Sequence, residues 1–70
     1  MNYKYYHNQS ISVLIYRIDS SEKVDCVGGA GVWIASGATA TQVRSVMKEI
    51  PSSMVNAIYK KIHNKSLTIA

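Results

Sequence analysis

The 70-residue chain has a single cysteine, Cys26, so no disulfide bond can form within it. Its two histidines, His7 and His63, are far apart in sequence and have no second cysteine to join them, so we expect no metal site. A lone cysteine with apolar neighbours is typical of a reducing compartment, and we expect a cytoplasmic protein in which Cys26 is a buried, unreactive thiol. Stability then has to come from the core, from dimerisation or from a partner.

Acidic residues are also scarce, with four against eight lysines and arginines and a net charge of +4. Asp19, Glu22 and Asp25 lie in or beside a predicted turn, where we expect solvent to leave the pKa values of their carboxyl groups unperturbed. A carboxylate pair of Asp19 and Asp25, or a Cys26–histidine couple, would need a pocket, and we expect so short a chain to have little volume for one. We therefore expect no catalytic residues, no cofactor and no enzyme.

Long hydrophobic runs are absent as well. The uncharged stretch from Cys26 to Val43 holds all four glycines, but it is strongly apolar only as far as residue 35, so we expect no membrane span. Gly29 and Gly31 form a G-x-G, yet Ile34 occupies the third glycine position of a phosphate-binding loop. We expect instead a strand over residues 24–35 that bends at a glycine bulge, or glycines that clear room for a partner beside Trp33.

What is present favours strands first and helices afterwards. Residues 10–19 are rich in β-branched side chains and apolar on both faces, which predicts a central strand, and residues 3–8 either prolong it or pair beside it. The segment DSSEK, residues 19–23, predicts the turn of a β-hairpin.

Two helices are expected in the second half of the chain. Thr39 and Gln42 match a capping box, with Thr41 as the alternative cap, and apolar residues at helical spacing predict a helix that continues to Ile50. Pro51 ends this helix or begins the next, which Ser52 or Ser53 caps. The second helix carries its own apolar stripe and ends near Asn64 in a left-handed conformation. Its stripe consists of Met54 or Val55, Ile58, Tyr59 and Ile62.

Because strands and helices are segregated, the sequence predicts one α+β domain over residues 1–70. We expect an antiparallel β-hairpin or three-stranded sheet packed on two short C-terminal helices that cover one of its faces. Residues 66–70 are a candidate for a short C-terminal strand.

Aromatic side chains suggest the function. Tyrosine and tryptophan are enriched at protein interfaces, and the open edges of a small sheet can pair with another chain. We therefore expect a small, non-enzymatic binding protein of the regulator or inhibitor type that acts through a protein–protein interface, with a homodimer as one form. The expected partner-binding residues are Tyr3, Tyr5, Tyr6 and Trp33.

The alternative is a nucleic-acid-binding protein. A basic cluster at the end of the second helix would contact phosphates, while aromatic residues of the sheet stack on bases. No known nucleic-acid-binding motif accompanies this cluster. Its residues are Lys60, Lys61, His63 and Lys65.

Overall fold

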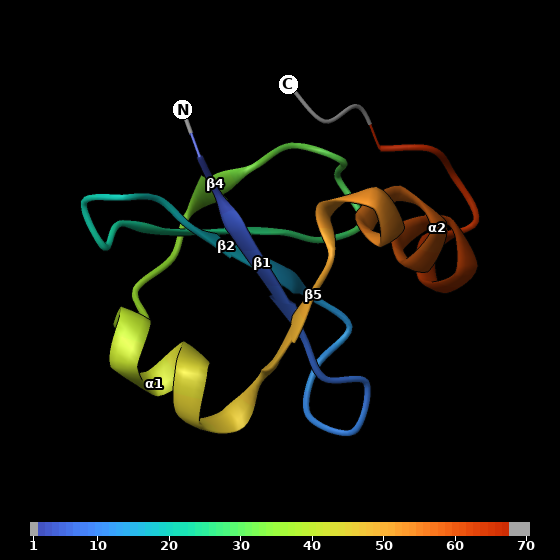
Figure 1. Cartoon of the computed structure of the whole chain (residues 1–70). Helices are drawn as coiled ribbons and strands as arrows, with labels where there is room; N and C mark the ends of the chain where they lie inside the picture. Colours follow the sequence, from blue (N-terminus) through green and yellow to red (C-terminus); the bar gives the residue numbers. More distant parts are fainter. Residues whose placement is uncertain (1, 68–70) are drawn as a thin grey trace.

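The computed structural model describes residues 2–67 of the chain (Figure 1). Five strands form one antiparallel sheet in the order β4-β3-β2-β1-β5, which confirms the α+β class but gives a larger sheet than predicted. The elements in chain order are β1 (Lys4–His7), β2 (Ile15–Ile18), β3 (Val24–Val27), β4 (Ile34–Ala35), α1 (Ala40–Val46), β5 (Lys48–Ile50) and α2 (Ser52–His63).

The central strands bury side chains on both faces of the sheet. Tyr5 and Tyr6 are neighbours on β1 and point to opposite faces, yet they are only 4% and 5% exposed. Tyr5 packs in a core with residues of α2, whereas Tyr6 packs in a second core with residues of α1. We call these sides the α2 face and the α1 face. The two helices therefore lie on opposite faces (Figure 1), and the prediction that both cover one face is wrong.

The predicted first strand is shorter than residues 10–19 and begins only at Ile15. A turn precedes it, in which the carbonyl of Asn8 accepts hydrogen bonds from the N–H groups of Ile11 and Ser12 at 2.9 and 3.0 Å. This turn reverses the chain, so that β1 pairs beside β2 in antiparallel register, with Tyr5 opposite Arg17. The second of the two options for residues 3–8 is thus confirmed.

The glycine-rich segment is a reversal between two strands, so the predicted single bulged strand over residues 24–35 is wrong. The N–H of Gly31 donates to the carbonyl of Gly28 at 3.1 Å, and β4 then returns beside β3 with Ile34 opposite Cys26. Tyr59 of α2 donates its hydroxyl proton to the same Gly28 carbonyl at 2.6 Å. This bond fixes the loop on the α2 face.

The first helix begins where predicted and ends early. Both hydrogen bonds of the Thr39–Gln42 capping box are present, but the helix stops at Val46 and the next residues form β5 against β1. Pro51 explains part of the difference, because a residue before proline is disfavoured in the helical region, which leaves Ile50 extended. Pro51 is itself the N-cap of α2 without a side-chain hydrogen bond, so the predicted serine caps are wrong, while the left-handed Asn64 is confirmed.

Leu67, the last described residue, belongs to the core on the α2 face. Leu67 is buried, and its N–H donates to the side-chain oxygen of Asn56 at 2.8 Å. Ser66 and Leu67 are not in a strand, and the rest of the predicted C-terminal strand lies outside the described residues. Neither helix within residues 2–67 has the length and hydrophobicity needed to cross a membrane.

Gly31 and Gly37 provide a matched test of the reversal. Gly31 has a φ of 75°, which strains any other L-residue, whereas a Cβ at Gly37 meets no described atom within 4 Å. We expect Gly31→Ala to lower the free energy of unfolding by roughly 1–2 kcal/mol. Gly37→Ala should leave it within about 0.5 kcal/mol of the wild type. Urea unfolding of both variants measures this, and equal effects would contradict the assigned loop conformation.

Candidate functional site

Strand β4 lies at one edge of the sheet and, among residues 2–67, pairs with β3 alone. Its residue Ile34 is 61% exposed, and Val32 just before it is 62% exposed. The surrounding sequence from Cys26 to Val43 carries no charged residue. Natural edge strands are usually protected from pairing by charges, prolines, bulges or very short length, and of these β4 has only its length of two residues.

The opposite edge differs in charge. Strand β5 pairs with β1 and exposes both Lys48 and Glu49. A charged, three-residue strand of this kind resists pairing with another chain. Within the described part of the chain, the sheet therefore has one edge protected by charge and one edge without charged residues, and we call the latter the unprotected edge.

Trp33 anchors the unprotected edge to the sheet. Its ring centroid lies 6.0 Å from that of Tyr5, and the guanidinium carbon of Arg17 lies 4.4 Å from the Trp33 ring centroid. The same guanidinium carbon also lies over the Tyr3 ring, 4.3 Å from its centroid. A cation held between two aromatic faces is attracted to both. Trp33 is thus held inward, while Val32 and Ile34 on either side of it remain exposed.

Asp25 completes the arrangement around Arg17. It lies directly opposite Arg17 in the β2–β3 register, and its carboxylate is 3.1 Å from the arginine Nε. The two side chains are only 15% and 14% exposed, so losing either partner would leave a largely buried charge unpaired. The indole Nε1 of Trp33 is buried without a hydrogen-bond partner among the described residues, a cost that the packing of its ring has to offset.

The four aromatic residues expected to bind a partner are not on one surface. The side chains of Tyr5 and Tyr6 are buried in the two cores, on opposite faces of the sheet. Tyr3 and Trp33 are partly buried on the α2 face, where they enclose Arg17. Only the exposed parts of Tyr3 and Trp33 are accessible to a partner, and Tyr5 and Tyr6 are part of the core.

The basic residues expected to contact phosphates do gather at the end of α2. Lys60, Lys61 and Lys65 are exposed, and none of them has an ion pair among the described residues. His63 is different, because its Nε2 lies 3.2 Å from the carbonyl of Val13 and its ring centroid lies 4.6 Å from that of Tyr59. His63 therefore joins α2 to the segment before β2.

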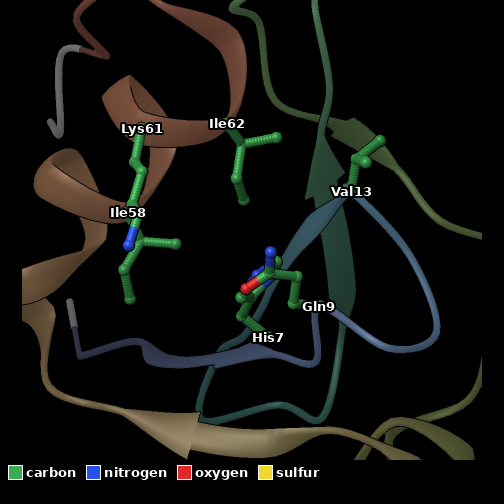
Figure 2. A pocket seen from close by; sticks show the side chains of 6 residues that line it. All are labelled: His7, Gln9, Val13, Ile58, Lys61 and Ile62. Carbon is green, nitrogen blue, oxygen red and sulfur yellow. The ribbon is translucent and has the colours of Figure 1, made fainter.

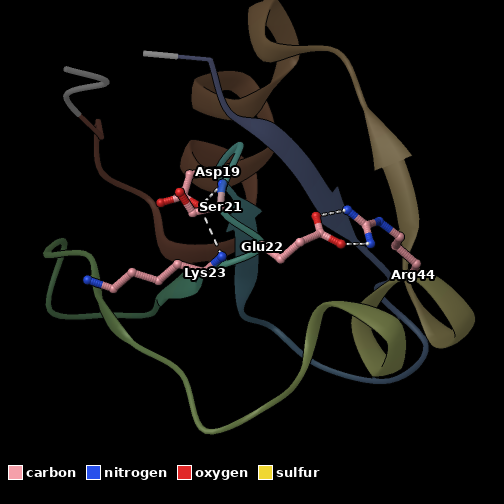
Figure 3. Close-up of polar contacts among 5 residues, drawn as sticks. All are labelled: Asp19, Ser21, Glu22, Lys23 and Arg44. Atoms are coloured by element: carbon pink, nitrogen blue, oxygen red, sulfur yellow. Dashed lines mark hydrogen bonds and ion pairs between the residues drawn. The ribbon is translucent and has the colours of Figure 1, made fainter.

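Asp19 and Glu22 form the polar contacts of the turn between β2 and β3 (Figure 3). The carboxylate of Asp19 accepts hydrogen bonds from the N–H groups of Ser21 and Lys23, both at 2.9 Å. Glu22 accepts two hydrogen bonds from Arg44 of α1, at 2.7 and 2.5 Å. These bonds lower the pKa of Glu22 and raise that of Arg44. Asp19 and Asp25 are each engaged separately and form no carboxylate pair.

Cys26 is separated from both histidines by the sheet. Its side chain lies on the α1 face, on the same side as its cross-strand neighbour Tyr16, whereas His7 and His63 belong to the α2 face. Burial raises the pKa of the Cys26 thiol, and Asp25 raises it further, against a hydrogen bond with Ser36 that lowers it. The structure thus brings no histidine to Cys26 and disfavours its thiolate.

A cavity of about 480 Å³ lies between α2 and the segment that connects β1 to β2 (Figure 2). The expectation of little pocket volume is therefore wrong. The sequence predicted that residues 10–14 belong to the same strand as β2. In the structure residues 8–14 lie outside the strands, and part of this segment lines the cavity beside α2. The lining residues are His7, Gln9, Val13, Ile58, Lys61 and Ile62.

Sequence reasoning missed the exposed edge residues Val32 and Ile34 and the lining of this cavity. The uncharged run from Cys26 to Val43 was the signal for the edge, since an unprotected edge strand lacks charges. The cavity had no sequence signal, because its residues come from two segments that are about 45 residues apart in the chain, residues 7–13 and 58–62.

No family model, curated protein or solved structure matches the chain.

The position of Cys26 predicts slow chemical modification. Because only the thiolate is nucleophilic, burial and the raised pKa should slow alkylation of the native protein at slightly alkaline pH by roughly tenfold or more relative to the urea-unfolded chain. Mass spectrometry after timed iodoacetamide quenches measures both rates. Equal rates would show that Cys26 is exposed or activated.

Proposed function

We propose that the protein is a non-enzymatic binding protein that recognises another protein chain by pairing at the β4 edge. The first partner we propose is a second copy of the same chain, which gives a homodimer. The observation that carries this proposal is the combination of one-sided pairing, exposed Val32 and Ile34, and the absence of charged residues from Cys26 to Val43.

Pairing at β4 fits two copies related by a two-fold axis. The unpaired backbone groups of an edge strand are hydrogen-bond partners for an added strand, and an antiparallel pair of identical strands is self-complementary. Because β4 has only two residues, few backbone bonds are available. Most of the association energy has to come from burying Val32 and Ile34, each worth roughly 1.5–3 kcal/mol when fully buried.

These contributions imply a weak dimer. Four such side chains are buried when two copies meet, while association itself costs about 4–15 kcal/mol of lost freedom. We therefore expect a reversible, concentration-dependent dimer with a Kd on the order of micromolar to millimolar.

A charge placed at the β4 edge tests this directly. Ile34→Lys should weaken dimerisation at least roughly tenfold, since two like charges would meet at the two-fold axis. Val46→Lys is the matched control, because Val46 is an exposed apolar residue of α1 and should leave the dimer intact. Sedimentation equilibrium over a range of concentrations measures both variants. A wild-type chain that stays monomeric, or equal effects of the two substitutions, would exclude the β4 homodimer.

Nucleic-acid binding remains a second candidate, favoured by the distribution of free charge. Both arginines are ion-paired, whereas all six lysines are exposed and unpaired within residues 2–67. Three of these lysines, Lys60, Lys61 and Lys65, are at the end of α2, where cations are also favoured by the helix dipole.

Salt dependence tests this candidate. If Lys60 and Lys65 contact phosphates, the double variant Lys60→Ala/Lys65→Ala should reduce the slope of log K against log salt by roughly two. The double variant Lys4→Ala/Lys23→Ala removes the same charge from the β1 end and the β2–β3 turn, and it should leave the slope unchanged. Fluorescence anisotropy with labelled single- and double-stranded oligonucleotides measures this. No binding at low salt, or equal losses in the two double variants, would exclude a specific footprint on α2.

A further inference from the structure

The cavity beside α2 has the size of a small-molecule site. Its volume of about 480 Å³ is within the range of roughly 300–1,000 Å³ that ligand pockets occupy. Ile58, Lys61 and Ile62 project from one face of α2, since they are three and four residues apart. His7 at the end of β1 and Gln9 in the following segment lie across from them (Figure 2).

Its lining combines an aliphatic wall with a few polar groups that carry no negative charge. Val13, Ile58 and Ile62 provide the apolar part, and Gln9 and Lys61 provide exposed hydrogen-bond donors. No aspartate or glutamate lines the cavity. The acidic residue of the neighbouring strand β5, Glu49, is opposite Tyr6 in the β1–β5 register and so belongs to the other face of the sheet.

A second lysine, Lys48, neighbours the lining residue His7. Lys48 is the direct cross-strand neighbour of His7 and is on the same face of the sheet. His7 is held in place because its Nδ1 lies 3.2 Å from the carbonyl of Leu14, which can only accept a hydrogen bond. Nδ1 therefore donates to this carbonyl and orients the imidazole.

We propose that this cavity binds a small, free monocarboxylate with an aliphatic chain. The chain would lie against Val13, Ile58 and Ile62, and the carboxylate would accept hydrogen bonds from the ammonium group of Lys61 and the amide of Gln9. A single exposed ammonium with an amide matches one carboxylate, whereas a phosphate group offers more acceptor oxygens than these donors satisfy. Apart from the imidazole of His7, the lining has no aromatic ring to stack on a base or a planar cofactor.

This site is independent of the β4 edge. The cavity adjoins β1 and α2, and β1 is separated from β4 by two strands of the sheet. Loss of dimerisation would therefore leave ligand binding intact, and failure of ligand binding would leave the proposed dimer untouched.

Octanoate, octan-1-ol and octylammonium are the probes for this proposal, because they share a chain and differ in charge. We expect octanoate to bind with a Kd on the order of 0.1–1 mM. Chemical-shift changes in ¹H–¹⁵N spectra should map to residues 7–13 and 58–62. Octan-1-ol and octylammonium should bind at least roughly tenfold more weakly, because they lack the carboxylate.

Two pairs of variants identify the residues. Lys61→Gln should weaken octanoate binding roughly tenfold, whereas Lys60→Gln, on the same helix but outside the lining, should not. Val13→Asp should abolish octanoate binding and strengthen that of octylammonium. Its control is Ile11→Asp in the same segment, since Val13 and Ile11 are 57% and 55% exposed and neither substitution disturbs the core.

The proposal is overturned if octan-1-ol binds as tightly as octanoate, or if the shifts map outside the cavity. Equal effects within either pair of variants would overturn it as well, as would the absence of shifts at millimolar octanoate. The ¹H–¹⁵N spectrum of each variant without ligand shows whether that variant is folded. If Lys61→Gln is unfolded, the comparison of Val13→Asp with Ile11→Asp, both at exposed positions, decides the outcome.

Discussion

The structure depends on one constraint, which is that interior strands of the sheet, β1 and β2 among them, carry buried apolar side chains on both faces. Tyr5 and Tyr6 on β1, and Ile15 and Ile18 on β2, require burial on opposite faces of the same sheet. A chain of this length can meet that requirement only by dividing its helices between the faces. The connection from α1 to α2 therefore has to pass the edge of the sheet, and β5 is the segment that does so while pairing with β1.

Both arginines form ion pairs that join elements of the fold, whereas the lysines are exposed and have no ion pair among the described residues. Arg17 is held between Tyr3 and Trp33 and neutralised by Asp25, which joins the N-terminal segment, the middle strands and the approach to β4. Arg44 joins α1 to the β2–β3 turn through Glu22. This exposed pair contributes little stability on its own, but it orients the helix on its face.

The resulting surface has two distinct regions at opposite sides of the sheet. The β4 edge is apolar and uncharged, which suits another polypeptide, whereas the region around α2 and β5 combines aliphatic side chains with lysines. The proposed protein contact and the proposed carboxylate site follow from this separation. The only thiol, Cys26, is buried on the α1 face, away from the cavity and the histidines.

Short-range interactions in the sequence were enough to predict the turn at Asp19, the Thr39–Gln42 capping box, the left-handed Asn64 and the apolar stripe of α2. Each of these depends on residues within a few positions of one another. The glycine reversal before β4, the pairing of β5, the sandwich around Arg17 and the cavity at Val13 and Ile58 were not predictable in this way. They bring together segments that are distant in the chain, and hydrophobic periodicity does not specify which strand pairs with which. The absence of charge around β4 could be read from the sequence. Its position at the edge of the sheet could not, because that position depends on how the five strands pair in the tertiary structure.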